Sequence, residues 1–128
     1  MNCTTAQPGA QARLLIYAAD AEGRPAARLH QTGLIDLSDT GAKTAPLSLS
    51  LAQGRTVWVG LHHSANATVS AWPGSASPDL NGGTQPTTAA RKALRRFVDF
   101  ADGGPMTWGF TSAEIVGGNV SAIWLRMA

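Results

Sequence analysis

Alternation of apolar and polar residues, interrupted by turn-forming residues, is the main pattern along this chain. Residues 45–52, APLSLSLA, show it most clearly. Leu47, Leu49 and Leu51 fall on one side of an extended chain and the serines between them on the other, because the side chains of a strand alternate between its faces. This stretch is therefore predicted to be a strand with one buried face.

Other short apolar segments also have the composition of strands. In residues 55–63, Val57, Val59 and Leu61 share one face. Turn-forming residues recur at intervals of roughly 8–12 positions, a spacing typical of sandwiches and barrels. We therefore predict an all-β, antiparallel fold of a single domain over residues 1–128. The predicted strands are residues 12–19, 28–37, 45–52, 55–63, 67–72 and 120–128.

Two segments depart from this pattern. Residues 73–88 have no periodic apolar positions, and their length predicts a functional or crossing loop. Residues 89–101 fit two structures. Their apolar positions suit one face of a short helix, while the alternation over residues 94–100 suits a strand equally well.

Composition narrows the class of protein. The 128 residues are 44% hydrophobic and 14% charged, and the recurring apolar runs argue against a disordered chain. No apolar run approaches the roughly 20 residues of a membrane-spanning helix. A single cysteine, Cys3, excludes an internal disulfide and zinc sites built on cysteine pairs. Each half carries five basic and four acidic side chains, so neither half has the basic excess of a nucleic-acid-binding domain.

Several motifs recur in an order known from one family. Ile16-Tyr17 ends a strand, and Asp20 to Pro25 forms an acidic D-x-x-G-x-P loop. Asp39 to Lys43 is a turn, and Gly54 to Leu61 is a strand of the G-x-Y-W-L-A kind. The later DGGPMTWGF and VSAIWLRMA stretches also fit. Together these motifs, which cover most of residues 10–128, resemble the β-sandwich tip domain of phage, prophage or gene-transfer-agent-like fibre and spike proteins.

The resemblance implies a jelly-roll-like sandwich on a virion appendage of the tail or head. It also implies a non-enzymatic role in adhesion to host-surface carbohydrate. Expected partners are further copies of the chain, with a homotrimer favoured, and other virion subunits. No cofactor, nucleic acid or membrane insertion is implied, and the protein would be made in the bacterial cytoplasm. The alternative function is that of a structural tail, baseplate or capsid-decorating protein that assembles subunits without touching a host.

Family members usually have further strands and an attachment region upstream. Here the first clear strand is predicted near residue 12. We therefore expect either the C-terminal part of a longer fibre or spike protein, or a sheet with an unpaired edge. Because exposed strand edges pair readily with other chains, both alternatives lead us to expect an oligomer or a partner chain.

The tryptophans are the first candidates for a carbohydrate site. Trp72 and Trp108 border loops rich in proline and glycine, where an amphipathic ring is often half exposed. A pyranose ring can stack on such an indole. Trp58 and Trp124 lie within predicted strands, and we expect them in the core.

His62 and His63 are further candidates for carbohydrate contact, because imidazole nitrogens hydrogen-bond hydroxyl groups. Neighbours on a strand point to opposite faces, so these two histidines are not expected to share a metal ion. We predict no metal site. A lone histidine directed to solvent near a loop is the simpler interpretation of each.

The acidic loop poses a separate question, because Asp20 and Glu22 could bind calcium. An EF-hand loop needs oxygen ligands over twelve residues and a closing glutamate. The twelfth residue from Asp20 is Gln31, so that motif fails. A turn held by Gly23 is the preferred interpretation, and a two-carboxylate calcium site completed by carbonyl groups remains the alternative.

Signals for catalysis are weak, and we predict that the protein is not an enzyme. No G-x-S-x-G elbow occurs, and most of the acidic residues lie in or beside turns rather than in a pair suited to glycoside cleavage. One cationic cluster could contact phosphate or an anionic polysaccharide, although a solvated face or an ion pair between subunits is the simpler interpretation. It consists of Arg91, Lys92, Arg95 and Arg96.

Overall fold

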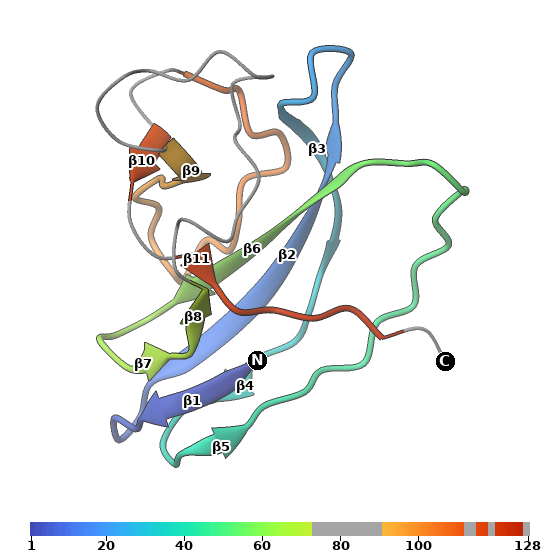
Figure 1. The fold of residues 1–128 in the computed structure, drawn as a ribbon. Helices are drawn as coiled ribbons and strands as arrows, with labels where there is room; N and C mark the ends of the chain where they lie inside the picture. Colours follow the sequence, from blue (N-terminus) through green and yellow to red (C-terminus); the bar gives the residue numbers. More distant parts are fainter. Residues whose placement is uncertain (73–90, 112–114, 118–119, 127–128) are drawn as a thin grey trace.

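The computed structural model describes residues 1–72, 91–111, 115–117 and 120–126, and Figure 1 shows their arrangement. These residues form strands and connecting segments, and none of them forms a helix. A helix that could span a membrane is accordingly not found in this part of the chain. The strands are β1 (Asn2–Thr5), β2 (Gln11–Ala19), β3 (Pro25–Gln31), β4 (Ile35–Asp36), β5 (Gly41–Ala42), β6 (Val57–His63), β7 (Thr68–Val69), β8 (Ala71–Trp72), β9 (Arg91–Leu94), β10 (Ile115–Gly117) and β11 (Val120–Ser121).

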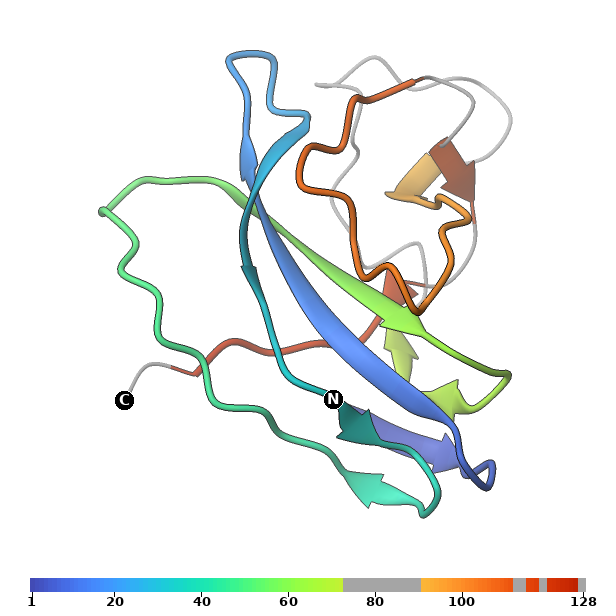
Figure 2. The same ribbon diagram turned by 180° about the vertical axis from the view of Figure 1, so that it is seen from behind.

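The larger antiparallel sheet is built around β2, the longest strand. β6 pairs with β2 along most of its length, from Ala12 opposite His63 to Ala18 opposite Val57. The other edge of β2 is shared by two strands, since β3 pairs with its second half and β4 with its beginning. In Figure 2 these long strands cross the molecule as one twisted layer. The apolar run at residues 12–19 therefore forms the centre of the fold, as its composition predicted.

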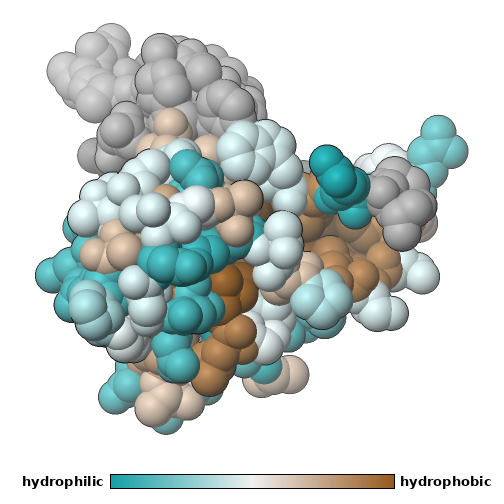
Figure 3. All heavy atoms as spheres, turned by 90° about the horizontal axis from the view of Figure 1, so that it is seen from below, coloured by the Kyte–Doolittle hydropathy of each residue, from teal (hydrophilic) through white to brown (hydrophobic). Residues whose placement is uncertain are grey.

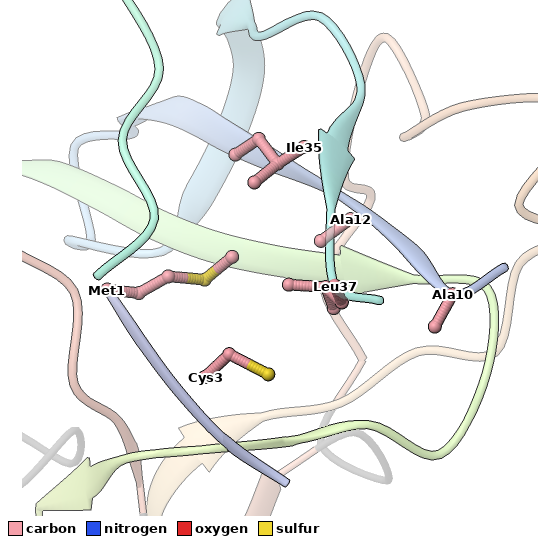
Figure 4. Close-up of a cluster of buried hydrophobic side chains, with 6 residues drawn as sticks. All are labelled: Met1, Cys3, Ala10, Ala12, Ile35 and Leu37. Carbon is pink, nitrogen blue, oxygen red and sulfur yellow. The ribbon is translucent and has the colours of Figure 1, made fainter. Parts of the chain in front are cut away.

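The second antiparallel sheet has the order β5-β1-β7 and packs against the first. Side chains from β1, β2, β4 and their connections meet between the two sheets (Figure 4). The prediction of an all-β, antiparallel, sandwich-like fold is thus confirmed. The buried residues of this core are Met1, Cys3, Ala10, Ala12, Ile35 and Leu37, and partly buried neighbours include Leu14, Leu61 and Val69.

β2 is buried on both faces. Ala12 and Leu14 contribute to the core between the sheets. Leu15 and Tyr17 point to the opposite face, where the turn at Gly104 packs directly on them. This second face is covered by the segment of residues 95–111, which carries the candidate site described below.

The predicted strand at residues 45–52 is wrong. Beyond Lys43 the chain leaves the sheet, and Leu47 and Leu51 stay 37% and 42% exposed. The ladder between β1 and β5 continues through hydrogen bonds between the backbones of Met1 and Lys43 and then stops. A strand needs a neighbour for its backbone groups, and none of the described residues supplies one to this segment.

The ends of the fold also differ from expectation. A strand forms at Asn2–Thr5, before the first one predicted, and it is the central strand of the second sheet. Of the predicted strand at 120–128, Val120–Ser121 is paired with β8, and the rest of the described tail is not in a sheet. Trp124, expected in the core, is 57% exposed because its segment runs outside the ladder.

The ambiguous segment 89–101 is resolved in part. Arg91–Leu94 forms β9, paired antiparallel with β10. The described residues after Leu94 form neither strand nor helix up to Phe100, so both the helix and the strand predicted for them are wrong. They are held by contacts to the large sheet instead, such as the 2.6 Å hydrogen bond from Arg13 to the Phe100 carbonyl. The predicted loop at 73–88 lies outside the described residues.

Candidate ligand-binding face around Trp108

Trp108 lies half-buried on the outer side of the large sheet. Its ring stands nearly perpendicular to that of Tyr17, with 5.3 Å between the ring centroids. Its backbone nitrogen donates a 2.9 Å hydrogen bond to the carbonyl of Ala26 in β3. The segment around Trp108 therefore continues the edge of the sheet, and the orientation of the indole is fixed by both backbone and side-chain contacts.

The turn Gly103-Gly104-Pro105 brings Trp108 to this place. Gly103 has φ +73°, a value that favours glycine. At Gly104 a Cβ atom would lie 2.6 Å from Leu15 Cδ1 and 3.0 Å from the Tyr17 hydroxyl, so only glycine lets the backbone approach so closely. The Gly104 amide donates to the side-chain oxygen of Gln31 at 2.9 Å, which fastens the turn to β3.

Guanidinium groups surround the aromatic rings of this face. The Arg96 guanidinium lies 5.1 Å from the centre of the Trp108 ring, and its Nη2 donates to the Gly109 carbonyl at 2.8 Å. Arg24 lies 5.2 Å from the centre of the Phe110 ring. Such stacking is attractive because the ring face is negative. We call Tyr17, Arg24, Arg28, Arg96, Trp108 and Phe110 the Trp108 face.

The electrostatics of Tyr17 reflect this environment. Burial of its hydroxyl raises the pKa of Tyr17 above 10.0, and the nearby positive charges of Arg28 and Arg96 partly oppose that shift. Arg28 is held in place by hydrogen bonds to the Gly104 carbonyl and the Gln31 side chain. Among the described residues, no carboxylate forms a salt bridge with Arg24 or Arg28, so their charge is compensated by solvent and by carbonyl dipoles.

This arrangement can bind an anion more readily than a neutral ring. Arg96 already covers part of the Trp108 ring, so a pyranose that stacked on the same face would have to displace the guanidinium. A carboxylate or sulfate could instead bind the guanidinium groups, which offer paired donors in a planar fork. The site therefore suits an acidic group attached to an apolar or sugar ring.

The other predicted carbohydrate contacts do not join this face in the described part of the structure. His62 packs against Phe100 with ring centroids 5.1 Å apart, and its Nε2 lies 3.1 Å from the Val98 carbonyl. His63 is exposed, and its Nδ1 lies 2.8 Å from the Ala65 carbonyl. The two rings project from opposite faces of β6, as predicted. Carbohydrate binding by either one remains a prediction.

Trp72 and Trp58 lie in strands β8 and β6. The backbone of Trp72 pairs with Val120 in the β8–β11 ladder, and its side chain lies outside the described part of the structure. Its proposed carbohydrate contact therefore remains a prediction. Trp58 is half-buried rather than deep in the core, and its Nε1 donates to the Gly23 carbonyl at 2.9 Å.

The acidic loop is organised as a turn. One Asp20 carboxylate oxygen accepts hydrogen bonds from the backbone nitrogens of Glu22 and Arg24, at 3.0 and 2.7 Å. Gly23 has φ +77°, as the turn interpretation requires. No group of three or more metal-binding side chains occurs among the described residues. The Asp20 carboxylate, a candidate calcium ligand in the sequence, thus accepts hydrogen bonds from the amides of its own loop.

Sequence reasoning missed most of the Trp108 face. Arg24 and Arg28 belong to a predicted loop and a predicted strand, and the structure places Arg24 over the Phe110 ring and Arg28 on the Gly104 carbonyl. No local pattern in the sequence signals this arrangement, because it depends on the long-range bridge between Ala27 and Thr107 and on the backbone hydrogen bonds beside it. Of the cationic cluster, Arg96 reaches the face, while Arg95 lies over the Phe97 ring.

Comparison with protein-family models, with curated proteins and with solved structures gives no match for this chain.

Proposed function

We propose that this protein is a non-enzymatic fibre or spike domain of a phage-like virion that recognises carbohydrate on the host surface. The order of motifs from Ile16 to Leu61 supports the family, and the two-sheet architecture is compatible with the jelly-roll topology that we propose for it. The Trp108 face supports the site. The observation that carries the proposal is the stack of Arg96 on Trp108 beside the exposed Arg24.

The sugar proposed for this site is acidic. Arg24 and Arg28 have no carboxylate partner among the described residues, and the Arg96 guanidinium lies over the Trp108 ring. A uronic acid, a sialic acid or a sulfated sugar would place its anionic group on the guanidinium groups. The ring of the same sugar would then lie against Phe110.

The site consists of a few guanidinium groups and rings on one face of the sheet, so we expect each copy to bind weakly. Useful strength would come from several copies acting together on a polymeric surface, because linked sites raise the effective concentration of each other. We therefore propose that the protein acts as a homo-oligomer on the virion, after synthesis in the bacterial cytoplasm.

A glycan array probed with the oligomer tests this proposal, with Arg24→Gln as the site variant and Arg55→Gln as its matched control. Both arginines are exposed, so neither change disturbs the core. The proposal predicts binding to acidic glycans that is weakened by Arg24→Gln and unchanged by Arg55→Gln. An array without any bound glycan, for a folded oligomer, contradicts it.

A structural virion protein without host contact is the second candidate function. It is favoured by the exposed leucines of residues 45–52, which are typical of a surface covered in an assembly. Particles that lack this protein distinguish the two functions. If they assemble fully and fail to adsorb to cells, adhesion is supported; if they fail to assemble, the structural function is supported.

A further inference from the structure

Residues 45–52 have the sequence of a strand but no strand partner among the described residues. Leu47 and Leu51 are 37% and 42% exposed, and Leu49 is half-buried. Leucine at three alternating positions is costly to leave in water, since each buried leucine contributes about 2 kcal/mol. Strand-like alternation without a neighbouring strand indicates a surface that is completed by another chain.

The backbone groups of this segment also lack hydrogen-bond partners among the described residues. Within the described part of the chain, residues 44–51 form no hydrogen bond, whereas Lys43 bonds to Met1 and Ala52 accepts from Arg55. The segment is thus an irregular stretch fixed at both ends, whose carbonyl groups and, apart from Pro46, amide groups have no bond to any described residue. Such an edge adds readily to a strand of another molecule.

The surroundings of this segment are apolar too. Ala45 and Ile123 both border the core cluster between the sheets. The tail that follows Ile123 exposes Trp124 and Leu125, by 57% and 45%. Figure 3 shows hydrophobic surface on the side of the molecule where the chain ends.

The sequence of the segment is suited to pairing with itself. No charged residue occurs between Thr44 and Gly54, although charges are the usual protection of an edge strand. At one boundary Lys43 is held by an ion pair with Asp39, which partly neutralises it. In an antiparallel pair centred on Leu49, leucines of one copy lie opposite leucines of the other, because directly opposite residues share a face.

We propose that residues 45–52 form a strand that pairs antiparallel with the same segment of a second copy of this chain. Leu47 then faces the partner's Leu51, and Leu49 faces the partner's Leu49. The contact is isologous, so it joins two copies about a two-fold axis. This differs from the trimer that the fibre resemblance implies, and it is independent of any carbohydrate site.

Two matched double variants test the pairing. Leu47→Lys with Leu51→Glu places opposite charges across the two-fold axis, whereas Leu47→Lys with Leu51→Lys places like charges there. Both replace the same two exposed leucines, and residues four apart on one strand lie too far apart to pair within a copy. Light scattering coupled to size-exclusion chromatography, over a dilution series, gives the mass of each.

The proposal predicts a dimer for the native chain and for the Lys/Glu variant, and a monomer for the Lys/Lys variant at the same concentration. Hydrogen exchange should show protected amides at residues 47–51 in the two dimers alone. Melting temperatures and circular dichroism establish that all three proteins are folded. A native monomer, a native trimer, or equal masses for the two folded variants would overturn the proposal.

Discussion

The Tyr17 hydroxyl donates a 3.0 Å hydrogen bond to the carbonyl of Pro105, which lies 88 residues away along the chain. This bond joins the central strand of the large sheet to the turn that precedes Trp108. The same tyrosine ring packs edge-on against the indole of Trp108. Tyr17 is therefore a positioning residue for the Trp108 face as well as one of its buried parts.

Replacing Gly104 with alanine should destabilise the protein by about 1–3 kcal/mol, the usual cost of overpacking. A methyl group at this position would lie 2.6 Å from Leu15 Cδ1, a distance that real Cβ contacts essentially never show, and 3.0 Å from the Tyr17 hydroxyl, which is a tight contact. Urea denaturation measures the change in the free energy of unfolding. Gly33→Ala is the control, because nothing lies within 4 Å of its Cβ position, and it should change stability little. Equal effects of the two substitutions would contradict this account of the turn.

The pKa of Tyr17 can be measured directly, because the chain has a single tyrosine. Titration followed by tyrosinate absorbance should show deprotonation of the native protein above pH 10, since burial raises the pKa above 10.0. The unfolded chain ionises first, at about pH 10.

The shift has a consequence for stability. The raised pKa of Tyr17 stabilises the folded protein fully below pH 10, where the hydroxyl is protonated in both the folded and the unfolded state. This stabilisation is lost as the pH rises through the pKa of the folded state, because the unfolded state then binds fewer protons than the folded state. The Tyr17→Phe variant should lack this part of the alkaline loss. A native titration midpoint at or below pH 10 would show that the hydroxyl is not buried against Pro105.

Asp20→Ala should lower the stability of the protein by roughly 0.5–1.5 kcal/mol, because the two amides of its loop lose their shared acceptor. Glu22→Ala should have a smaller effect, since this side chain accepts no hydrogen bond from an amide of the described residues. Thermal melting compares the two variants. Calcium should leave the melting temperature of the native protein unchanged, and a clear increase with calcium would favour the two-carboxylate metal site.

Strands were predicted correctly from the sequence where a segment is buried on both faces of the sheet. They were also predicted correctly where apolar and polar residues alternate in a segment that pairs with a long neighbouring strand. Residues 12–19 lie in β2 and residues 57–63 form β6, and the two strands pair with each other from Ala12 opposite His63 to Ala18 opposite Val57. The alternation of Leu47 to Leu51 is stronger, and yet it gave the wrong structure. Periodicity reports which residues share a face, whereas a strand also needs a partner for its backbone.

The site was harder to predict than the fold for a related reason. Trp108 was selected from its place beside a glycine-rich turn, and the structure does put it half-exposed on the surface. Its neighbours Tyr17, Arg24 and Arg28 come from the other end of the chain. The bridge from Ala27 to Thr107 and the hydrogen bond from Tyr17 to Pro105 bring these segments together, and no local pattern contains that information.

The central claim is that the Trp108 face binds an acidic sugar, and binding to one polysaccharide before and after reduction of its carboxyl groups tests it most directly. The polysaccharide should be a uronic-acid polymer that the native oligomer recognises on an array. We predict that reduction abolishes binding and that added salt weakens it, because the guanidinium groups contact the carboxylate. Equal affinity for the acidic and the reduced polymer, independent of salt, would contradict the account.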